Sequence, residues 1–220
     1  MAMHKILLVD DHPLLREGLG RLIAADAKLR ICGMAGTVQE ALVLVESEKP
    51  DLVITDLTLP GRNGLELIKD LGATHPEIPV MVLSMHDEII YAERVLRAGG
   101  SGYVMKDTSP DRLLEAIRVV LGGGVFASPA VTTHFLQTLS PGKGQSKPSF
   151  PMERLTDREM EVFELIGHAK SNHEISCQLG ISPRTVDAHR AHIREKLGLG
   201  DGNDLTRQAI RWVEVGMIRQ

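Results

Sequence analysis

The sequence is poor in aromatic residues, in cysteine and in positive charge, and each shortage narrows the classes of protein to consider. Phe, Tyr and Trp make up 3% of the 220 residues, too few for the stacking platforms that bind single-stranded nucleic acid. Cys32 and Cys177 lie in different halves of the chain, with neither disulfide nor metal-site spacing, which fits a reducing compartment. The formal net charge of -4 provides no overall basic field to indicate nucleic acid.

Long hydrophobic runs are missing as well. The apolar run that follows Lys5 is too short for a secretion signal or a membrane span, so we expect a cytoplasmic protein with no membrane partner. The composition that remains is ordinary for a globular protein, with 43% hydrophobic and 25% charged residues. The length allows one or two domains.

Short apolar runs alternate with amphipathic stretches through the first half of the chain. The predicted strands are Ile6–Val9, Ile31–Ala35, Leu52–Thr55, Val80–Leu83 and Gly102–Val104. The predicted helices are Leu14–Ala24, Val38–Glu46, Leu65–Leu71, Ile89–Ala98 and Arg112–Leu121. Five strand–helix pairs predict an α/β fold, a doubly wound parallel sheet whose ligand crevice lies at the carboxyl ends of the strands. The pattern alone leaves the order of the strands open.

The composition changes between Ser140 and Met152, where SPGKGQSKPSFPM is rich in proline, glycine and serine and is typical of a linker. A short extra helix is expected before it, at Pro129–Leu139. After it, the sequence has helical periodicity and no strand pattern. We therefore predict a first domain at 4–122, a linker at 123–151 and an all-α domain at 152–217.

A polar side chain follows each of four predicted strands: Asp10 and Asp11, then Asp56, Ser84 and Lys106. The carboxyl ends of parallel strands share one edge, so these groups should converge. Clustered carboxylates repel one another unless a cation holds them, and hard oxygen ligands suit Mg²⁺. An Asp beside Mg²⁺ can be a nucleophile toward a phosphoryl group, whose oxygens the lysine and the serine could meet. The alternative is that the aspartates only cap the following helices.

The segments ILLVDDHPLLREGL, DLVITDLTLPGRNGLE, VLSMHD and AGGSGYVMKD resemble the receiver domain of bacterial two-component response regulators. The resemblance covers nearly all of residues 4–122. It implies a flavodoxin-like sheet of five strands in the order 2-1-3-4-5. It also implies that Asp56 accepts a phosphoryl group from a sensor histidine kinase. Mg²⁺ would be held by Asp11, Asp56 and the backbone carbonyl of Thr58, with Asp10 acting through a water molecule.

The same resemblance assigns the remaining polar groups to a switch. Lys106 would pair with the phosphoryl oxygens, Ser84 would be the switch hydroxyl, and Tyr103 would be the aromatic residue that turns inward. His12, next to the acid pair, is interpreted as a surface or loop residue and not as a ligand.

Three start signals organise the C-terminal part into helices. Capping boxes are predicted at Thr156 with Glu159 and at Ser171 with Glu174. After a turn at Gly180, Ser182 caps a third helix that has Pro183 in its first position and ends near Leu197. A fourth helix is expected over Asp204–Met217. A short helix, a glycine turn and a second helix are typical of a helix-turn-helix, although other bundles contain such turns.

The third of these helices has two unlike faces. Its core side carries Val186, Ile193 and Leu197, and its opposite side carries Arg184, Ala188, Ala191 and Glu195. Small side chains on the outer face allow a close approach to a DNA groove.

The stretch LTDREMEVFELIGHAKSNHEISCQLGISPRTVDAHRAHIREKLGL resembles the LuxR-type helix-turn-helix domain of the NarL/FixJ response regulators. The resemblance spans about residues 152–217 and implies binding to double-stranded promoter DNA. It implies a DNA-contacting set of twelve residues: Lys170, Asn172, Ser182, Arg184, Thr185, Asp187, Ala188, His189, Arg190, Ala191, Arg194 and Lys196.

One departure concerns charge. Residues 151–220 carry ten Lys and Arg against eleven Asp and Glu, so the domain is not basic. Asp187 stands where a cationic or neutral base-reading residue is common. A carboxylate can accept a hydrogen bond from cytosine N4, so Asp187 either reads a base or is a solvent-facing helix charge.

We predict a phosphorylation-controlled transcription regulator that binds a promoter as a homodimer when phosphorylated, and not an enzyme that turns over a metabolite. Helix Asp204–Met217, with Trp212 and Val213, is the candidate dimer surface; alternatively it closes the core of its own domain. Two other classes stay open. An adaptor would bind protein with its second domain. A Mg²⁺-dependent phosphohydrolase would use Asp56 as nucleophile, but usually with a second Asp where Thr58 stands.

Overall fold

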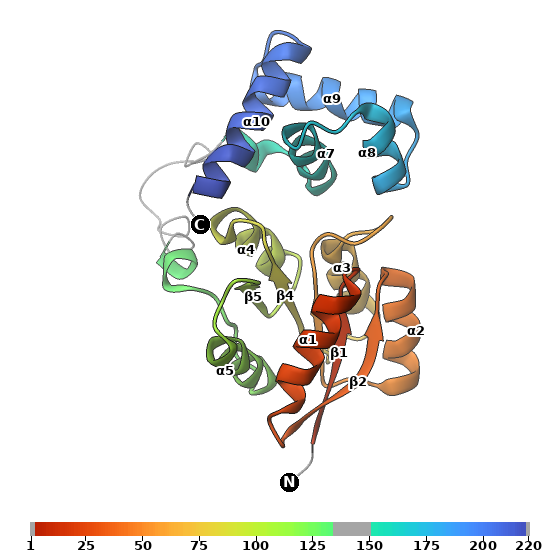
Figure 1. Ribbon diagram of the computed structural model, residues 1–220, viewed down its shortest axis with the longest axis vertical. Coiled ribbons are helices and arrows are strands. Elements are labelled where there is room, and N and C mark those ends of the chain that lie inside the picture. The colour runs from red at the N-terminus through yellow and green to blue at the C-terminus, as the bar shows by residue number, and fades with distance from the viewer. Residues whose placement is uncertain (1–2, 134–150, 219–220) are drawn as a thin grey trace. The chain divides into compact units, whose positions relative to one another are not determined.

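The computed structural model describes residues 3–133 and 151–218 (Figure 1). The chain divides into two compact units with the boundary between Leu139 and Ser140, and each is described by itself. Within the described ranges, no helix is long and apolar enough to cross a membrane.

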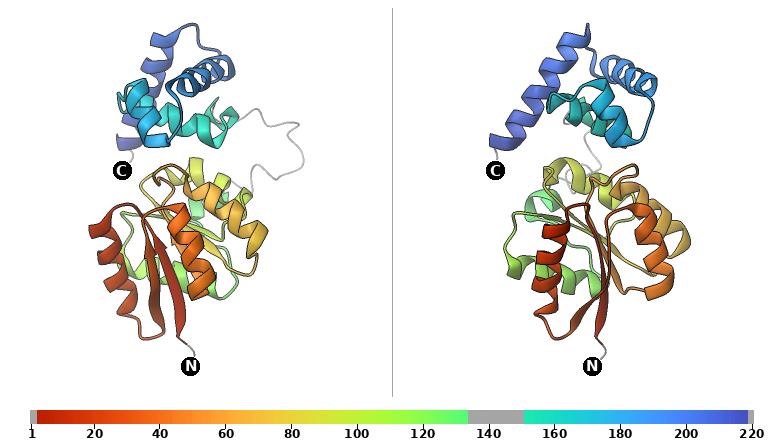
Figure 2. Two further views of the ribbon diagram at one scale, coloured as in Figure 1. Left: turned by 90° about the vertical axis from the view of Figure 1, so that its right-hand side faces the viewer. Right: turned by 45° about the vertical axis from the view of Figure 1, so that its right-hand side comes forward.

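The N-terminal domain is a five-stranded parallel sheet with helices on both faces (Figures 1 and 2). Its strands are β1 (His4–Val9), β2 (Leu29–Ala35), β3 (Leu52–Thr55), β4 (Val80–Ser84) and β5 (Gly102–Met105). Its helices are α1 (Pro13–Ala24), α2 (Val38–Glu48), α3 (Gly64–Thr74), α4 (Glu88–Arg97) and α5 (Pro110–Leu121). The strand order β2-β1-β3-β4-β5 is the predicted one.

One part of the core of this domain forms where α1 and α5 cover one face of the sheet. Alternate residues of the strands, such as Ile6 and Leu8 of β1, meet Ile23 of α1 and Ile117 of α5 there. All four residues of β3 are buried, because helices cover both faces of the sheet at its centre. This explains why Leu52, Val53 and Ile54 follow one another without polar alternation.

Side-chain caps set the helix starts, and they place several helices one or two residues earlier than hydrophobic periodicity indicates. The side chains that accept from a backbone N–H of the first turn are those of Thr37, Asn63, Asp87 and Ser109. Proline occupies the first turn of α1 and of α5, where its missing N–H costs nothing. The apolar pattern begins only where the helix meets the sheet, so it misses these polar first turns.

The chain returns to the sheet after α5. Phe126 pairs with the outer edge of β5, donating its N–H to the Ser101 carbonyl and accepting from Tyr103 N–H, both at 3.0 Å. Ser128 donates to Glu88 at the start of α4 at 2.7 Å. Residues 129–133 are helical, the first part of the expected helix Pro129–Leu139. Residues 134–139, and the rest of the expected linker to residue 150, lie outside the described residues.

The C-terminal domain contains a short 3-10 helix, η1 (Pro151–Arg154), and four α-helices: α7 (Asp157–Gly167), α8 (Asn172–Leu179), α9 (Pro183–Leu197) and α10 (Gly202–Ile218). Both predicted capping boxes are present, on α7 and α8. Gly180 and Gly198 end α8 and α9 in the left-handed conformation, at φ 63° and 66°. Helix α10 begins two residues before the predicted Asp204, because the Asp201 carboxylate accepts from two N–H groups of its first turn.

Helix α10 packs closely on α7. A Cβ atom added to Gly167 of α7 would lie 2.5 Å from the carbonyl oxygen of Ala209 and 2.5 Å from Val213. Leu205 and Ala209 are fully buried. This side of α10, to which Val213 belongs, therefore closes the core of its own domain, which is the alternative role weighed for this helix. Trp212 is half-buried.

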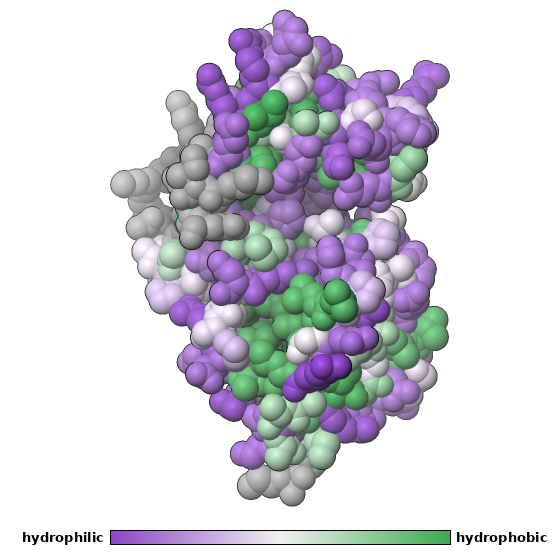
Figure 3. Space-filling model, viewed as in Figure 1, coloured by the Kyte–Doolittle hydropathy of each residue, from purple (hydrophilic) through white to green (hydrophobic). Residues whose placement is uncertain are grey.

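The surface of the N-terminal domain carries an apolar area. On the face shown in Figure 3, hydrophobic side chains gather where Figure 1 draws α1. Leu14, in the first turn of that helix, is 86% exposed.

Candidate functional site

Two carboxylates and an ammonium meet at the carboxyl ends of the strands. Asp10 follows β1, Asp56 follows β3 and Lys106 follows β5. The Lys106 Nζ atom lies 2.7 Å from the Oδ2 atoms of both aspartates. All three side chains are at most 7% exposed, so the charges face one another and not bulk water. The predicted convergence of these groups is present.

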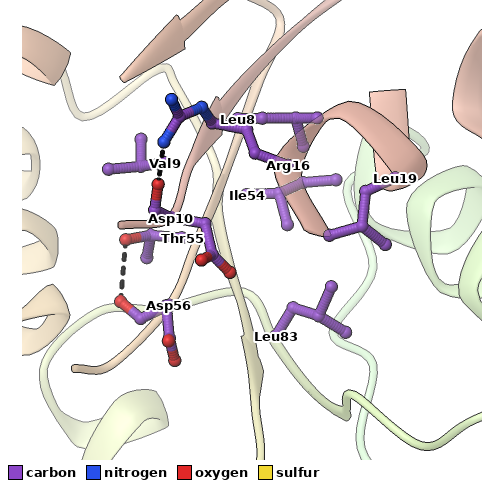
Figure 4. Close-up of a pocket in the computed structure, with 9 residues that line it drawn as sticks. All are labelled: Leu8, Val9, Asp10, Arg16, Leu19, Ile54, Thr55, Asp56 and Leu83. Carbon is purple, nitrogen blue, oxygen red and sulfur yellow. Dashed lines mark hydrogen bonds between the residues drawn. The ribbon is translucent and has the colours of Figure 1, made fainter. Parts of the chain in front are cut away.

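The Asp56 carboxylate is held from two sides. Its Oδ1 atom accepts from the backbone N–H of Leu57 at 2.7 Å, and its Oδ2 atom accepts from Lys106. The Thr55 hydroxyl donates to the Asp56 carbonyl at 2.9 Å, as Figure 4 shows. A Cβ at Gly64 would lie 2.2 Å from that carbonyl, so the start of α3 can approach the end of β3 only with glycine at this position.

The electrostatics favour a charged lysine. Burial works to lower the pKa of Lys106, but the charges of Asp56 and Asp10, and the hydrogen bonds to them, outweigh it and raise the pKa above its usual value. The ammonium therefore balances one of the two buried carboxylates, and negative charge remains at this edge of the sheet.

A third carboxylate lies at the mouth of the same site. Asp11 is 35% exposed, and its Oδ1 atom is 2.7 Å from Nδ1 of His12. One ligand atom from each of Asp10, Asp11, His12 and Asp56 falls within 4.8 Å of the others. This is an acidic cluster able to hold a cation. The sequence interpretation left His12 out of the cluster, because a single histidine in a loop gives no spacing signal.

The pocket beside Asp10 and Asp56 is small and mainly apolar inside. Figure 4 shows Leu8, Leu19 and Ile54 around it, with the Arg16 guanidinium donating to the Asp10 carbonyl. Its volume of about 10 Å³ has room for about one water molecule. A group larger than water could therefore reach the Asp56 carboxylate only from its open side and not through this pocket.

The two residues predicted to form a switch, Ser84 and Tyr103, both contact a histidine that sequence reasoning missed. Ser84 is fully buried at the end of β4, and its hydroxyl accepts from the His86 N–H at 3.3 Å. Tyr103 is 1% exposed and donates to the His86 carbonyl at 2.7 Å, so its side chain occupies an inward position. The His86 ring is 2.8 Å from the hydroxyl of Thr58, in the loop after Asp56. His86 thus connects the loop after β3 with the end of β4 and with the Tyr103 side chain of β5.

In the C-terminal domain, α8, Gly180 and α9 form the predicted helix-turn-helix. Val186 and Ile193 of α9 are buried. The predicted DNA-facing residues Arg184, Thr185, Asp187, Ala188 and Ala191 are exposed. Three more residues of the set flank them: Ser182 caps α9 through Thr185, the Lys170 Nζ atom lies 3.7 Å from a carboxylate oxygen of Glu174, and Asn172 donates to Asp187.

Four predicted contact residues lie partly inside the domain: His189, Arg190, Arg194 and Lys196. Burial lowers the pKa of the His189 imidazole and that of the Arg190 guanidinium. Lys196 differs most from the prediction, because its Nζ atom is 2.6 Å from Oε2 of Glu159, a residue only 4% exposed. This ammonium neutralises a buried carboxylate of the domain core, so we do not carry Lys196 forward as a phosphate contact.

Comparison with known proteins agrees with this division of the chain. Residues 6–118 match the response regulator receiver domain, and residues 153–209 match the luxR family of bacterial regulatory proteins. The chain is 33% identical to the transcriptional regulatory protein DegU of Brevibacillus brevis, across 96% of this chain and 95% of that protein. It is also 33% identical to the response regulator GacA of Pseudomonas aeruginosa, across 95% of this chain and 96% of that protein.

Solved structures share the fold. The RcsB response regulator of Salmonella typhimurium superposes with a TM-score of 0.71 at 21% identity, across 96% of this chain and 98% of that one. A LuxR-family response regulator from Aurantimonas matches 62% of this chain and 98% of that one, with a TM-score of 0.59 at 34% identity. The chain belongs to the response regulators that join a receiver domain to a luxR-type domain, the NarL/FixJ family. It is a DNA-binding transcriptional regulator of a two-component system.

Proposed function

We propose that Asp56 is the phosphoacceptor of this regulator, and that its phosphorylation by a sensor histidine kinase controls promoter binding by α9. The receiver would comprise residues 4–122 and the DNA-binding domain residues 152–217. The observation that carries the proposal is the Asp56 carboxylate, which the Leu57 N–H and the Lys106 ammonium hold at an open edge of the sheet.

The reaction is a displacement at phosphorus. An oxygen of the Asp56 carboxylate would form a P–O bond as the P–N bond of the kinase phosphohistidine breaks, and the leaving imidazole would take a proton from solvent. Lys106 is placed to pair with the phosphoryl oxygens, because its Nζ atom is already 2.7 Å from Oδ2 of Asp56. Phosphorylation adds about -1.5 to -2 of charge at this point.

The donor set fits Mg²⁺. Asp10, Asp11 and Asp56 offer hard carboxylate oxygens in one cluster, and the Thr58 carbonyl is available in the adjoining loop. When bound, Mg²⁺ would neutralise the acidic edge and the charge of an incoming phosphoryl group. His12 is 67% exposed and offers a ring nitrogen in place of the hard oxygen that Mg²⁺ prefers, so we assign it no coordinating role.

A kinase that reaches Asp56 has to approach the same edge of the sheet. Helix α1 begins at Pro13, two residues after Asp11, and exposes Leu14 in its first turn. An exposed apolar side chain beside an active carboxylate suits a protein partner more than a small metabolite. This supports a phosphodonor that is itself a protein.

A switch could connect the site with the rest of the domain. Ser84 and Tyr103 both contact the backbone of His86, directly before α4. Movement of the Ser84 hydroxyl toward a phosphoryl oxygen would remove its contact with the His86 N–H. We therefore propose the face formed by α4 and β5 as the element with two states.

The test of the phosphoacceptor is labelling of the full chain with a small phosphodonor in Mg²⁺. Wild type should take up one acid-labile phosphate per chain, and Asp56→Asn should take up none, because an amide is not a nucleophile here. Asp111→Asn, an exposed position at the start of α5, is the matched control and should label like wild type. Stoichiometric labelling of Asp56→Asn would contradict the assignment.

A further inference from the structure

The outer face of α9 presents a carboxylate between arginines. Asp187 is exposed in the second turn, with Arg184 three residues before it and Arg190 three residues after it. Its Oδ1 atom accepts a hydrogen bond of 2.5 Å from Nδ2 of Asn172, which begins α8. The contact therefore joins the two helices of the helix-turn-helix at the surface.

The hydrogen bond fixes how the carboxylate can act. The Asn172 amide occupies one oxygen of Asp187 and limits rotation of the side chain, so the second oxygen is presented at a set angle. A charge that served only to keep the helix soluble would gain nothing from such a support. Ala188 and Ala191 lie exposed on the same helix and leave room for a base edge to approach.

Base chemistry selects one partner for an acceptor that cannot donate. In the major groove, guanine presents two acceptors, thymine one acceptor and a methyl group, and adenine a donor beside an acceptor. Cytosine alone presents its N4 donor without an acceptor on the same base. A carboxylate would be repelled by the acceptors of guanine and thymine and attracted by the N4 donor of cytosine. At adenine, attraction by the donor and repulsion by the neighbouring acceptor would partly cancel.

We propose that Asp187, positioned by Asn172, selects a cytosine in each half-site of the promoter. The inference rests on the proposal that α9 enters the major groove. It also gives a reason why the contacting helix of a DNA-binding domain carries an anion: the negative charge weakens binding to every sequence that lacks the cytosine. Arg184 and Arg190 flank the carboxylate and limit its repulsion from the DNA phosphates.

The test is enrichment of the phosphorylated full chain on a pool of random duplex DNA, followed by affinity measurements on the enriched sequence. Wild type should enrich a motif with a fixed cytosine in each half-site. Replacing that cytosine should weaken wild type by roughly 5- to 100-fold per half-site. Asp187→Ala should bind both sequences equally. Asp187→Asn should shift the preference toward adenine, since the amide oxygen can accept from the N6 amino group while the amide nitrogen donates to N7.

Two further variants separate base reading from general electrostatics. Glu195→Gln removes one negative charge from the same helix and should raise affinity for all sequences without changing the base preference. Asn172→Ala should keep the cytosine preference but reduce its size, because the carboxylate loses its support. An unchanged motif for Asp187→Ala would overturn the inference and assign Asp187 as a solvent-facing charge.

Arg184→Ala distinguishes failure of this inference from failure of the proposed interface. If Arg184→Ala weakens binding while Asp187→Ala leaves the motif intact, α9 still contacts DNA and only the cytosine selection is wrong. If neither variant changes binding, the interface on α9 is wrong as well, and the inference falls with it. Thermal melting followed by fluorescence of Trp212, the single tryptophan of the chain, shows that each variant is folded.

Discussion

At the scale of single residues, the receiver site is governed by an excess of buried negative charge. Asp10 and Asp56 are each about 6% exposed, and one ammonium serves both of them. Removing one member of a buried charge group costs more than the group contributes, because the partners remain buried without compensation. Lys106 therefore stabilises the fold of the domain as well as positioning Asp56.

Lys106→Met should destabilise the N-terminal domain by about 3–5 kcal/mol in the absence of divalent cations, because two buried carboxylates lose their counter-charge. Adding Mg²⁺ should restore part of the lost stability, since a cation can replace the ammonium among the carboxylates. The measurement is urea unfolding followed by circular dichroism, with and without Mg²⁺. Lys28→Met, at an exposed position, is the control and should show neither effect. A Lys106→Met domain as stable as wild type without Mg²⁺ would contradict this account.

The buried Glu159 of the C-terminal domain predicts a dependence of stability on pH. Burial works to raise the pKa of this carboxyl, but hydrogen bonds from Lys196 and Thr156 outweigh it and lower the pKa below its usual value. A carboxyl with a lowered folded pKa stabilises the fold above its unfolded pKa, and this contribution is lost as the pH falls through the folded value. The domain should therefore lose stability as the pH falls from about 5 to about 3.

Glu159→Gln isolates this contribution. The amide keeps an oxygen for the Thr156 N–H but loses the ion pair with Lys196, so the variant should be about 1–3 kcal/mol less stable at neutral pH. Its melting temperature, followed through Trp212, should also change less between pH 5 and pH 3 than that of wild type. Parallel pH profiles for the two proteins would show that another carboxylate is responsible.

At the scale of secondary-structure elements, close packing of helices depends on where glycine stands. Gly167 lies where α7 meets α10, with no room for a Cβ atom. Gly72 lies on the exposed side of α3, with nothing within 4 Å of such an atom. The same substitution should therefore have opposite signs at the two positions.

Gly167→Ala should destabilise the C-terminal domain by about 1–3 kcal/mol, because the carbonyl of Ala209 is backbone and cannot move aside cheaply. Gly72→Ala should stabilise the N-terminal domain by about 0.5–1 kcal/mol, because alanine loses less conformational entropy in a helix. The measurement is chemical denaturation with two probes. Fluorescence of Trp212 follows only the C-terminal domain, and circular dichroism follows both domains. Equal and small effects at both positions would mean that α10 is not docked on α7.

The sequence predicts elements better than it predicts contacts between them. Every predicted strand and helix of the described residues is present, because apolar periodicity reports directly on which face is buried. Convergence of Asp10, Asp56 and Lys106 also follows from the parallel sheet alone. The pattern says nothing about His86, Lys196 or Asn172, whose partners lie far along the chain and leave no periodic signal.

At the scale of the whole molecule, charge limits how tightly one chain can bind DNA. The chain carries a net charge of -4, and residues 151–220 contribute ten cations and eleven anions. With Lys196 paired to Glu159, the cations left for phosphate contacts among the predicted residues are Lys170, Arg184, Arg190 and Arg194. Each phosphate that is neutralised contributes about -0.9 to the slope of log K against log salt.

A single DNA-binding domain should therefore bind weakly, with a salt slope no steeper than about -4. The phosphorylated full chain should bind as a dimer to a repeat with half-sites roughly 10 bp apart, and its slope should approach about twice that of the single domain. The measurement is a salt titration of residues 151–220 and of the full chain on one promoter fragment. Asp56→Asn in the full chain, treated with the same phosphodonor, is the control and should keep the shallow slope. Tight binding by monomeric 151–220, with the slope of the full chain, would contradict the coupling of phosphorylation to dimeric binding.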